Sequence, residues 1–375
     1  MPRDDDRYRY HEIARELRGG IARGEFRNQG KLPSERTLTA RFGVQRNTIR
    51  QALEVLEREG RIETHGRRGS FLTERDAPVR DTLLLSLPGG DSPQLGHLAV
   101  GVERGARAAG LRVARIAAWH PEGAALDLVP DPSTLPPAAA GMILWPQNPT
   151  DEAAIARLEA ALPLVLVDRR VLGVVADVVH FDDVAGGRTV TEHLIAQGHR
   201  RIGFLTDDAF AETVQHRWRG YAAALEAADI PIDPTDSLFL NGIHEPYFTI
   251  SMRYQLGRTD RPTAFVCAND VNAFRLMRFL QAEGVRVPDD LAVTGYGNTM
   301  PDFVRAMALT SVDQPFERLG ERAVALLAER ILASPAPGTE PGARAGARQD
   351  VTIPVRLVER SSSRRKTPSQ PVSPA

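Results

Sequence analysis

The stretch from Leu32 to Phe71 constrains the fold more than any other part of this 375-residue chain. Ser34 is a good N-cap, and the short helix predicted after it ends at Gly43, a residue typical of helix C-termini. After a tight turn, the apolar residues recur with the i, i+3, i+4, i+7 spacing of a second helix. These apolar residues are Ile49, Ala52, Leu53 and Leu56, and the opposite face carries Arg46, Asn47, Arg50 and Gln51.

A basic, glycine-containing tip follows the second predicted helix. Two strand-like runs, 61–64 and 70–73, flank the residues His65 to Gly69, and this pattern predicts a β-hairpin wing. Residues 1–75 carry 17 Arg and Lys against 12 Asp and Glu, whereas the rest of the chain carries 30 against 36. Helix, turn, helix and wing together with positive charge indicate a module that binds double-stranded DNA.

The remaining residues divide into recognisable segments. The apolar stripe of Tyr10, Ile13, Ala14, Leu17 and Ile21 predicts a further helix packed behind the pair, which completes a domain over 1–74. Residues 75–81 mix charge with Pro78 and are interpreted as a linker. We expect one large domain over 82–360, with a flexible loop at 335–348 and a last strand pair around 351–358, and a disordered tail over 361–375.

From Thr82 onward, short apolar runs alternate with helical segments. The strand-like runs are TLLLSL, GLRVARI, AGMILW, LPLVLV, DVVHF, RRIGFL, SLFL, TAFVCA and LAVTGY, several of them typical of buried parallel strands. Helices are predicted near 97–109, 151–161, 184–197, 213–228, 247–257, 270–284 and 316–333. The predicted fold class is therefore α/β, with an N-terminal winged helix-turn-helix and a two-lobed, doubly wound α/β domain like that of periplasmic binding proteins.

Composition excludes several other classes of protein. Apolar residues make up 42% of the chain and charged residues 25%, which is ordinary for a soluble globular protein. No apolar stretch approaches the roughly 18 residues that cross a bilayer, and the first ten residues lack the apolar region of a signal peptide. The single cysteine, Cys267, excludes an internal disulfide and is interpreted as a small buried residue. We expect a cytoplasmic protein with no membrane partner.

The residues from Leu32 to Phe71 resemble the GntR-type winged helix, whose LPSER, GVSR-TVR-AL, EG and G-GTF-like segments are matched nearly throughout. The resemblance implies that the outward face of the second helix enters the major groove and that the wing contacts the backbone or minor groove. The predicted DNA-binding residues are Arg36, Gln45, Arg46, Asn47, Thr48, Arg50, His65 and Gly66. The family commonly has Ser at position 45, so here the recognition helix loses a side-chain cap, or Gln45 reaches a base edge instead.

Several runs beyond Val165 resemble the effector-binding domain of LacI-type regulators, among them HFDDVAGGRTVTEHLIAQGHRRIGFL, RWRGYAAALEAADI, PTAFVCANDVNAF and LTSVDQPFERLGERAVALL. The resemblance is close over 165–332 and loose over 82–164. It implies a two-lobed fold whose cleft holds a small ligand, most often a sugar. The combination with a GntR-type module resembles bacterial arabinose repressors, although arabinose itself does not follow. The effector-binding residues implied are Asp168, Phe181, Arg217, Asn269, Asp270, Gln314 and Asn298.

Residue positions support a cleft site independently. Asp168 directly follows LPLVLV, and Asn269 and Asp270 follow TAFVCA, so these polar groups lie at the carboxyl ends of strands, where α/β sheets bind ligands. The fork of donors on Arg217 suits two hydroxyls or a carboxylate. The alternatives are that Asp270 and Asp183 cap helices, that Arg217 forms an ion pair at the surface, and that aromatic residues only pack. Those packing candidates are Trp119, Trp145 and His244.

One departure from the LacI pattern bears on the ligand. The family usually has Asp in a GF-D-D or GY-D-D turn, whereas this chain has Gly297 and Asn298 after Tyr296. A carboxylate that commonly accepts hydrogen bonds from sugar hydroxyls is therefore absent. Either Asn298 takes its place or the effector is not a common hexose.

Enzymatic and transport functions fit the sequence poorly. Lys31 and Lys366 are the only lysines, and neither lies where a pyridoxal-phosphate Schiff base would be needed. Phosphate-loop, zinc-protease and nucleophile-elbow motifs are absent, and the nearest candidate metal group, His180 with Asp182 and Asp183, is interpreted as structural. A solute-binding protein shares the sensor fold but needs no winged helix. We therefore expect no cofactor, and a homodimeric, ligand-responsive repressor that binds operator DNA and a sugar-like effector; the alternative effector is a nucleoside.

Overall fold

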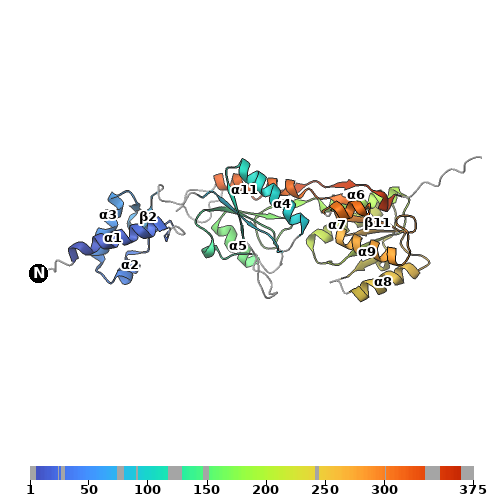
Figure 1. Ribbon diagram of the computed structural model, residues 1–375, viewed down its shortest axis with the longest axis horizontal. Helices are drawn as coiled ribbons and strands as arrows, with labels where there is room; N and C mark the ends of the chain where they lie inside the picture. The colour runs from blue at the N-terminus through green and yellow to red at the C-terminus, as the bar shows by residue number, and fades with distance from the viewer. Residues whose placement is uncertain are drawn as a thin grey trace, which may run out of the picture.

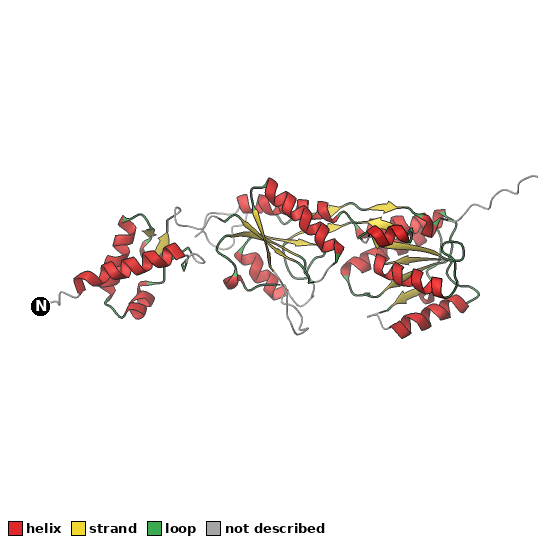
Figure 2. Cartoon of the chain, in the orientation of Figure 1, coloured by secondary structure: helices red, strands yellow, loops and turns green. Residues whose placement is uncertain are grey.

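The computed structural model describes residues 6–23, 25–26, 30–73, 80–89, 92–116, 129–146, 152–240, 245–299, 301–333 and 347–364. Figure 1 shows a winged-helix module at one end and two α/β lobes beyond it, and Figure 2 shows that each lobe has a sheet with helices against it. Trp119, His244 and most of the expected linker and loop lie outside the described residues.

The winged-helix module is built from α1 (Asp6–Arg23), α2 (Glu35–Phe42), α3 (Arg46–Arg58), β1 (Ile62–Thr64) and β2 (Ser70–Leu72). Its core contains the apolar stripes of all three helices, and β1 and β2 pair as the expected antiparallel hairpin. Ser34 caps α2 by accepting a hydrogen bond from the Thr37 amide, and Gly43 ends that helix at φ 63°. The helices and the wing predicted from the sequence are therefore confirmed.

The lobe nearer the winged helix, here called the N-lobe, contains a six-stranded parallel sheet in the order β13-β7-β6-β5-β3-β4. Its strands are β3 (Thr82–Ser86), β4 (Arg112–Ile116), β5 (Ala139–Leu144), β6 (Leu164–Val167), β7 (Asp177–Phe181) and β13 (Asp350–Ile353). Helices α4 (Pro93–Ala108) and α11 (Phe316–Ala333) contribute to one apolar cluster, and α5 (Glu152–Ala161) to another. Near-continuous apolar strands thus lie between two layers of helices, as expected for a doubly wound sheet.

The second lobe, the C-lobe, has the strand order β14-β12-β11-β10-β8-β9, parallel except for β14. Its strands are β8 (Ile202–Thr206), β9 (Ser237–Phe239), β10 (Ala264–Cys267), β11 (Ala292–Gly297), β12 (Thr310–Asp313) and β14 (Arg356–Val358). Its helices are α6 (Asp183–Ala196), α7 (Glu212–Ala227), α8 (Glu245–Gly257), α9 (Asp270–Ala282) and the short α10 (Pro301–Ala306). Gly187 and Gly220 let α6 and α7 pack closely, because a Cβ at either glycine would lie within 2.2 Å of the facing helix backbone.

The chain crosses between the lobes three times, after β7, after β12 and between β13 and β14. The last crossing corrects the expectation of a final strand pair, because β13 joins the N-lobe sheet and β14 the C-lobe sheet. Pro354 lies between them and lacks the amide hydrogen that a continuing ladder requires. The strand β12, which follows α10, was not among the strands predicted from the sequence.

The expected disordered tail also needs a correction at its first residues. Residues Ser361–Ser363 form a 3-10 turn, and Ser362 and Ser363 are buried. Ser362 Oγ donates to the Val293 carbonyl (2.6 Å) and accepts from the Thr310 amide (2.9 Å). Backbone partners from β11 and β12 therefore fix this segment, whereas residues 365–375 lie outside the described part of the chain.

Candidate DNA-binding face and interlobe cleft

The recognition helix α3 begins at Arg46 with Gln45 as its N-cap residue. Gln45 is extended and makes no side-chain capping hydrogen bond, so the predicted loss of a cap is confirmed. Its side chain is exposed beside those of Arg46, Asn47 and Arg50, which lie on the outward side of the helix. The N-terminal turn of α3 thus presents donors and acceptors suited to base edges in a major groove.

Thr48 differs from the other predicted groove residues because it is only 7% exposed. It lies on the packed side of α3 next to Ile49 and one turn before Ala52, both fully buried. The side chain of Thr48 therefore belongs to the inner face rather than to the outward group. The sequence did not predict this placement, because a small polar residue at the border between the apolar and polar faces of a helix fits either face.

The remaining predicted DNA contacts lie on α2 and in the wing. Arg36 is exposed in the first turn of α2, and His65 is exposed just before Gly66, which adopts φ 47° at the hairpin tip. The His65 ring packs 5.6 Å from the Phe71 ring, measured between centroids. Lys31 forms an antiparallel bridge with Phe71, and its Nζ lies 5.1 Å from the centroid of the same ring. The tip is thus supported by its own strand and by the segment before α2.

Asp168 follows β6 in the N-lobe and adopts φ 73° while only 6% exposed. Burial raises the pKa of this carboxyl, and Asp183 raises it further, whereas nearby Arg169 and Arg217 act in the opposite direction. Asp183 and Arg217 belong to α6 and α7 of the C-lobe. The carboxyl edges of the two sheets therefore face each other closely enough for their charges to interact.

Arg217 is buried in an ion pair rather than free at the surface. Its Nε donates to Asp183 Oδ1 at 2.9 Å, and its Nη1 donates to the Ala268 carbonyl at 2.8 Å. The guanidinium carbon lies 3.9 Å from the centroid of the Tyr296 ring. The predicted alternative of a surface ion pair is therefore wrong in its location, because Arg217 does form an ion pair but both side chains, 9% and 2% exposed, are buried in the C-lobe.

The polar residues after β10 and β11 are engaged largely with the protein itself. Asn269 caps α9 by accepting from the Asn272 amide (2.8 Å), and Asp270 accepts from Ser311 Oγ (2.6 Å). Asn298 donates to Asp313 Oδ1 (2.9 Å) and accepts from Arg360 Nη2 (3.0 Å). The structure therefore assigns Asn298 two internal partners, and an effector contact of the kind expected from the sequence would have to compete with both.

At the facing edges of the two sheets, by contrast, three buried side chains and the partly buried Arg169 carry buried polar atoms without a hydrogen-bond partner among the described residues. These atoms are Trp145 Nε1, Arg169 Nε, Tyr296 Oη and Gln314 Nε2. Trp145 and Arg169 follow β5 and β6 of the N-lobe, whereas Tyr296 and Gln314 lie at the ends of β11 and β12 of the C-lobe. All four can donate a hydrogen bond, so the facing edges of both sheets offer donors to a ligand with several acceptors.

Aromatic rings lie next to these donors. Trp145 stacks on Phe316 with ring centroids 5.8 Å apart, and Phe181 packs against Phe316 in a T-shaped arrangement with centroids 4.8 Å apart. Phe181 is only 1% exposed, and Phe316 follows Gln314 by two residues at the crossing into the N-lobe. Phe181 thus supports the Phe316 ring from inside the N-lobe core rather than lying open at the cleft.

Two hydrogen-bonded contacts join the lobes at the margins of this region. Gln94 Nε2 of α4 donates to Thr299 Oγ1 after β11 at 3.3 Å. Arg170 of the N-lobe donates from its backbone to Glu212 Oε2 of α7 at 3.0 Å and from Nη1 to Oε1 at 3.3 Å. His180 Nε2 lies 2.7 Å from Asp350 Oδ1 next to Arg170. Among the described residues, no group of three or more His, Cys, Asp or Glu side chains could hold a metal ion.

Comparison with known proteins agrees with this architecture. Residues 9–72 match the model of the gntR family of bacterial regulatory proteins, and residues 191–363 match that of a periplasmic binding protein-like domain. A crystal structure of a LacI family transcriptional regulator from Mycobacterium smegmatis has a TM-score of 0.60 at 26% identity and covers 76% of this chain and 98% of that one. The fold and both matches define a transcriptional regulator that joins a GntR-type helix-turn-helix to a LacI-type ligand-binding domain.

The chain is a homologue of named transcriptional repressors. It is 27% identical to the arabinose metabolism transcriptional repressor of Geobacillus stearothermophilus over 86% of this chain and 91% of that protein. It is also 32% identical to the HTH-type transcriptional repressor PurR of Mannheimia succiniciproducens, over 51% of this chain and 57% of that protein. Its homologues are thus regulators, and none of its described helices is both long and apolar enough to cross a membrane.

Sequence reasoning missed three groups of the candidate site: Arg169, Tyr296 and Asp183 as an ion-pair partner. Arg169 directly follows Asp168 at a strand end, so the rule that singled out Asp168 also applies to it. Tyr296 lies inside an apolar run and offered no signal beyond its position near a strand end. The pairing of Asp183 with Arg217, 34 residues later, depends on how α6 packs on α7.

Proposed function

We propose that this protein is a cytoplasmic repressor that binds palindromic operator DNA as a homodimer and responds to a small polyhydroxylated effector bound between its lobes. The outward side of α3 reads base edges, while Arg36 and the wing contact the backbone. Effector binding changes how the lobes meet, and this changes the separation of the two DNA-binding modules. Coupling of this kind is limited to the difference in effector affinity between the two states, typically about 1 to 3 kcal/mol.

The set of unpartnered buried donors carries the effector proposal. A buried polar group without a partner costs free energy, and natural proteins retain such groups where a ligand or water satisfies them. Donors from both lobes facing one region favour a ligand with acceptors on several sides, such as a sugar or sugar derivative. The arabinose repressor among the relatives supports this class. A nucleoside is the second candidate, because its base and its ribose also carry several hydrogen-bond acceptors.

A thermal-shift screen of sugars, polyols and nucleosides against the full-length protein tests the proposed effector class. A ligand at 100 times its dissociation constant should stabilise the protein by about 2.7 kcal/mol. The matched variant is Gln314→Met, which removes the unpartnered amide nitrogen while keeping a similar side-chain volume. Its melting temperature without ligand should be unchanged or higher, and its stabilisation by the ligand should fall. Equal stabilisation of both proteins would contradict the assignment of Gln314, and no hit in any class would contradict the proposed effector.

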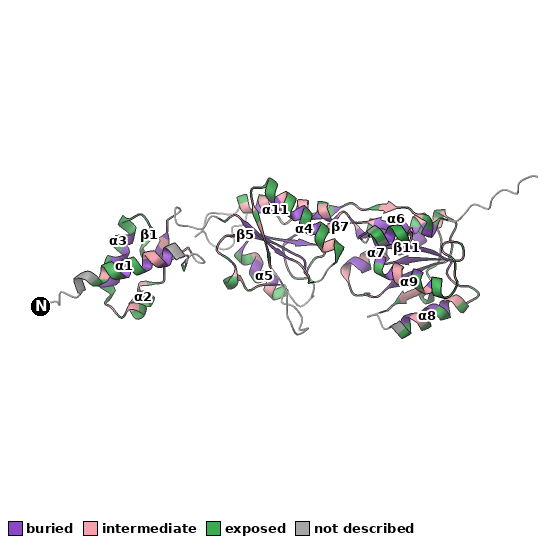
Figure 3. Ribbon diagram, in the orientation of Figure 1, coloured by how far each residue is buried: buried purple, intermediate pink, exposed green. Residues whose placement is uncertain are grey.

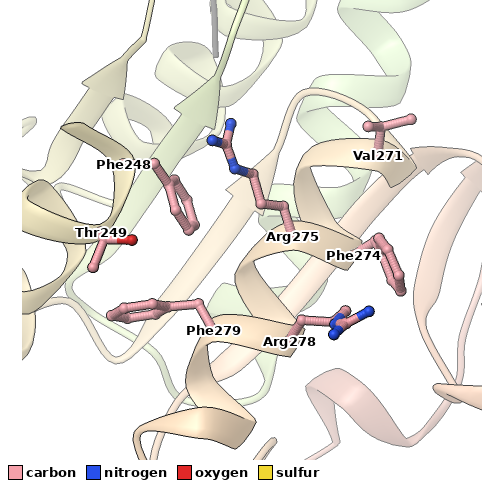
Figure 4. Close-up of a pocket in the computed structure, with 7 residues that line it drawn as sticks. All are labelled: Phe248, Thr249, Val271, Phe274, Arg275, Arg278 and Phe279. Atoms are coloured by element: carbon pink, nitrogen blue, oxygen red, sulfur yellow. The ribbon is translucent and has the colours of Figure 1, made fainter. Parts of the chain in front are cut away.

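An exposed face of α8 supports the proposed dimer. Tyr247, Ile250 and Tyr254 are 67%, 64% and 66% exposed, at spacings of three and four residues along one side of the helix. Beside them lies a cavity of about 530 Å³ between α8 and α9, lined by Phe248, Thr249, Val271, Phe274, Arg275, Arg278 and Phe279 (Figure 4). Figure 3 shows the exposed surface of α8 at the margin of the C-lobe. Apolar surface grouped in this way is typical of an interface between protein chains.

Replacing Tyr254 with glutamate should convert a dimer to a monomer, because a charge in the centre of an isologous interface is introduced twice. Sedimentation velocity of the full-length protein at micromolar concentration measures the change. Leu172→Glu is the control, since Leu172 is 91% exposed but lies in the N-lobe, away from α8. A Tyr254→Glu protein that remains a dimer would place the interface elsewhere.

A further inference from the structure

Glu35 is an acidic residue within the surface that is proposed to face DNA. It lies in the first turn of α2, beside exposed Arg36, and its side chain is 29% exposed. Its carboxylate accepts hydrogen bonds from two residues of α3: Arg46, through Nε to Oε2, and Arg50, whose Nε lies 3.2 Å from Oε1 and 3.3 Å from Oε2. One carboxylate therefore bridges the two arginines that the recognition helix presents outward.

Neither capping nor core packing explains this arrangement. Ser34 already caps α2 through its hydroxyl, so the Glu35 carboxylate is not needed for that purpose. The bridge spans 11 and 15 residues of sequence and joins the N-terminal ends of both helices of the motif. The hydrogen bond from Arg46 is the main cause that lowers the pKa of Glu35, with burial opposing and Arg50 adding to the effect. The carboxylate is therefore charged at neutral pH.

We propose that Glu35 is a specificity-determining positioning residue, which holds Arg46 and Arg50 in one fixed arrangement and opposes their use as general phosphate contacts. The inference rests on the proposed DNA-binding function. An arginine that is free to rotate can reach phosphates on any DNA, and such contacts carry no sequence information. An arginine held by a carboxylate has a restricted direction, and a negative charge beside it repels the phosphate backbone. Correct base edges compensate for these effects on the operator, whereas random DNA offers no compensation.

The proposal predicts opposite changes on the two kinds of DNA. Glu35→Gln removes the charge, so affinity for random DNA should rise, and its dependence on salt should steepen by up to about 0.9 in the logarithmic slope. Affinity for the operator should stay constant or fall, because the two arginines lose their common anchor. The ratio of operator to random-DNA affinity should therefore fall roughly tenfold, a change comparable to a single mismatched base pair.

The experiment uses the full-length protein and two duplexes. The first is the 30-base-pair sequence that the wild-type protein enriches from a random library, and the second is a scrambled duplex of the same composition. Fluorescence anisotropy at several salt concentrations gives both affinities for the wild type, Glu35→Gln and Glu12→Gln. Glu12 is an exposed residue of α1, so its variant makes the same charge change without touching either arginine. Thermal unfolding of each variant checks that the module remains folded.

A lower ratio in Glu35→Gln together with an unchanged ratio in Glu12→Gln supports the assignment. Ratios that agree within twofold for the two variants would overturn it, since the effect would then be one of net charge alone. If Glu35→Gln proves unstable, Glu35→Asp serves instead, because it keeps the charge but shortens the reach. That variant should lose operator affinity without gaining affinity for random DNA, and wild-type behaviour would overturn the positioning role. Failure of the wild type to enrich any sequence would contradict DNA recognition itself.

Discussion

Replacing Arg217 with alanine should lower the melting temperature by roughly 6 to 20 °C, because the change leaves the Asp183 carboxylate buried without its partner. Asp183 and Arg217 have side chains that are 2% and 9% exposed, and the guanidinium also supplies a donor to the Ala268 carbonyl. Removing one member of a buried ion pair typically costs about 3 to 5 kcal/mol, and each kcal/mol shifts the melting temperature of a domain of this size by about 2 to 4 °C.

A double variant separates the ion pair from simple loss of packing. Arg217→Met should be strongly destabilised, whereas Arg217→Met with Asp183→Asn should recover much of the loss, since no charge then remains buried. Differential scanning calorimetry of the two proteins measures the recovery, and equal losses would show that packing dominates. The expected destabilisation also means that effector binding by Arg217→Ala does not test a direct contact between Arg217 and the effector. A weaker effector interaction in that variant follows from a disturbed C-lobe as well as from a lost contact, so Gln314→Met is the cleaner test.

Replacing Arg46 with alanine should reduce affinity for the operator far more than affinity for random DNA. A bidentate arginine to guanine contributes roughly 1 to 3 kcal/mol, which corresponds to about a 5- to 150-fold loss. Arg46 is exposed at the start of α3, and its Nε donates a hydrogen bond to the Glu35 carboxylate. Arg58→Ala is the matched control, because Arg58 lies in the last turn of the same helix. Anisotropy titrations with the enriched and scrambled duplexes measure both affinities, and an equal loss on the two would show that Arg46 contacts only phosphate.

The local parts of the fold could be predicted well from the sequence. The caps at Ser34 and Gly43, the apolar stripe of α3 and the glycines of the wing are signals that act within a few residues. The α/β alternation was equally clear because parallel strands buried on both faces are continuously apolar. The sequence did not predict which of the two sheets each strand joins. The segments that became β13 and β14 look like neighbours, and only the three-dimensional crossing at Pro354 places them in different sheets.

The candidate site was predicted in position but not in detail. Strand ends drew attention to Asp168 and Asn269, since carboxyl ends of parallel strands meet at one edge, whereas Gln314 was implied by the family resemblance. The partners of each group come from distant segments, as when Ser311 satisfies Asp270 or Arg360 satisfies Asn298. A single sequence does not show which polar groups are already satisfied. The packed structure is needed to distinguish a donor that already has a structural partner from a donor that is left for a ligand.

The position of the last strands also has a consequence for the order in which the protein becomes functional during synthesis. The winged helix needs only residues 6–73 for its described core, whereas β13, β14 and the turn at Ser361–Ser363 complete both lobes. At roughly 5 to 20 residues per second, translation from residue 82 to residue 364 takes about 15 to 60 s. During that interval the growing chain carries a finished DNA-binding module, but β7 and β12 each lack a neighbouring strand. The proposed DNA-reading surface is therefore complete before the proposed effector site.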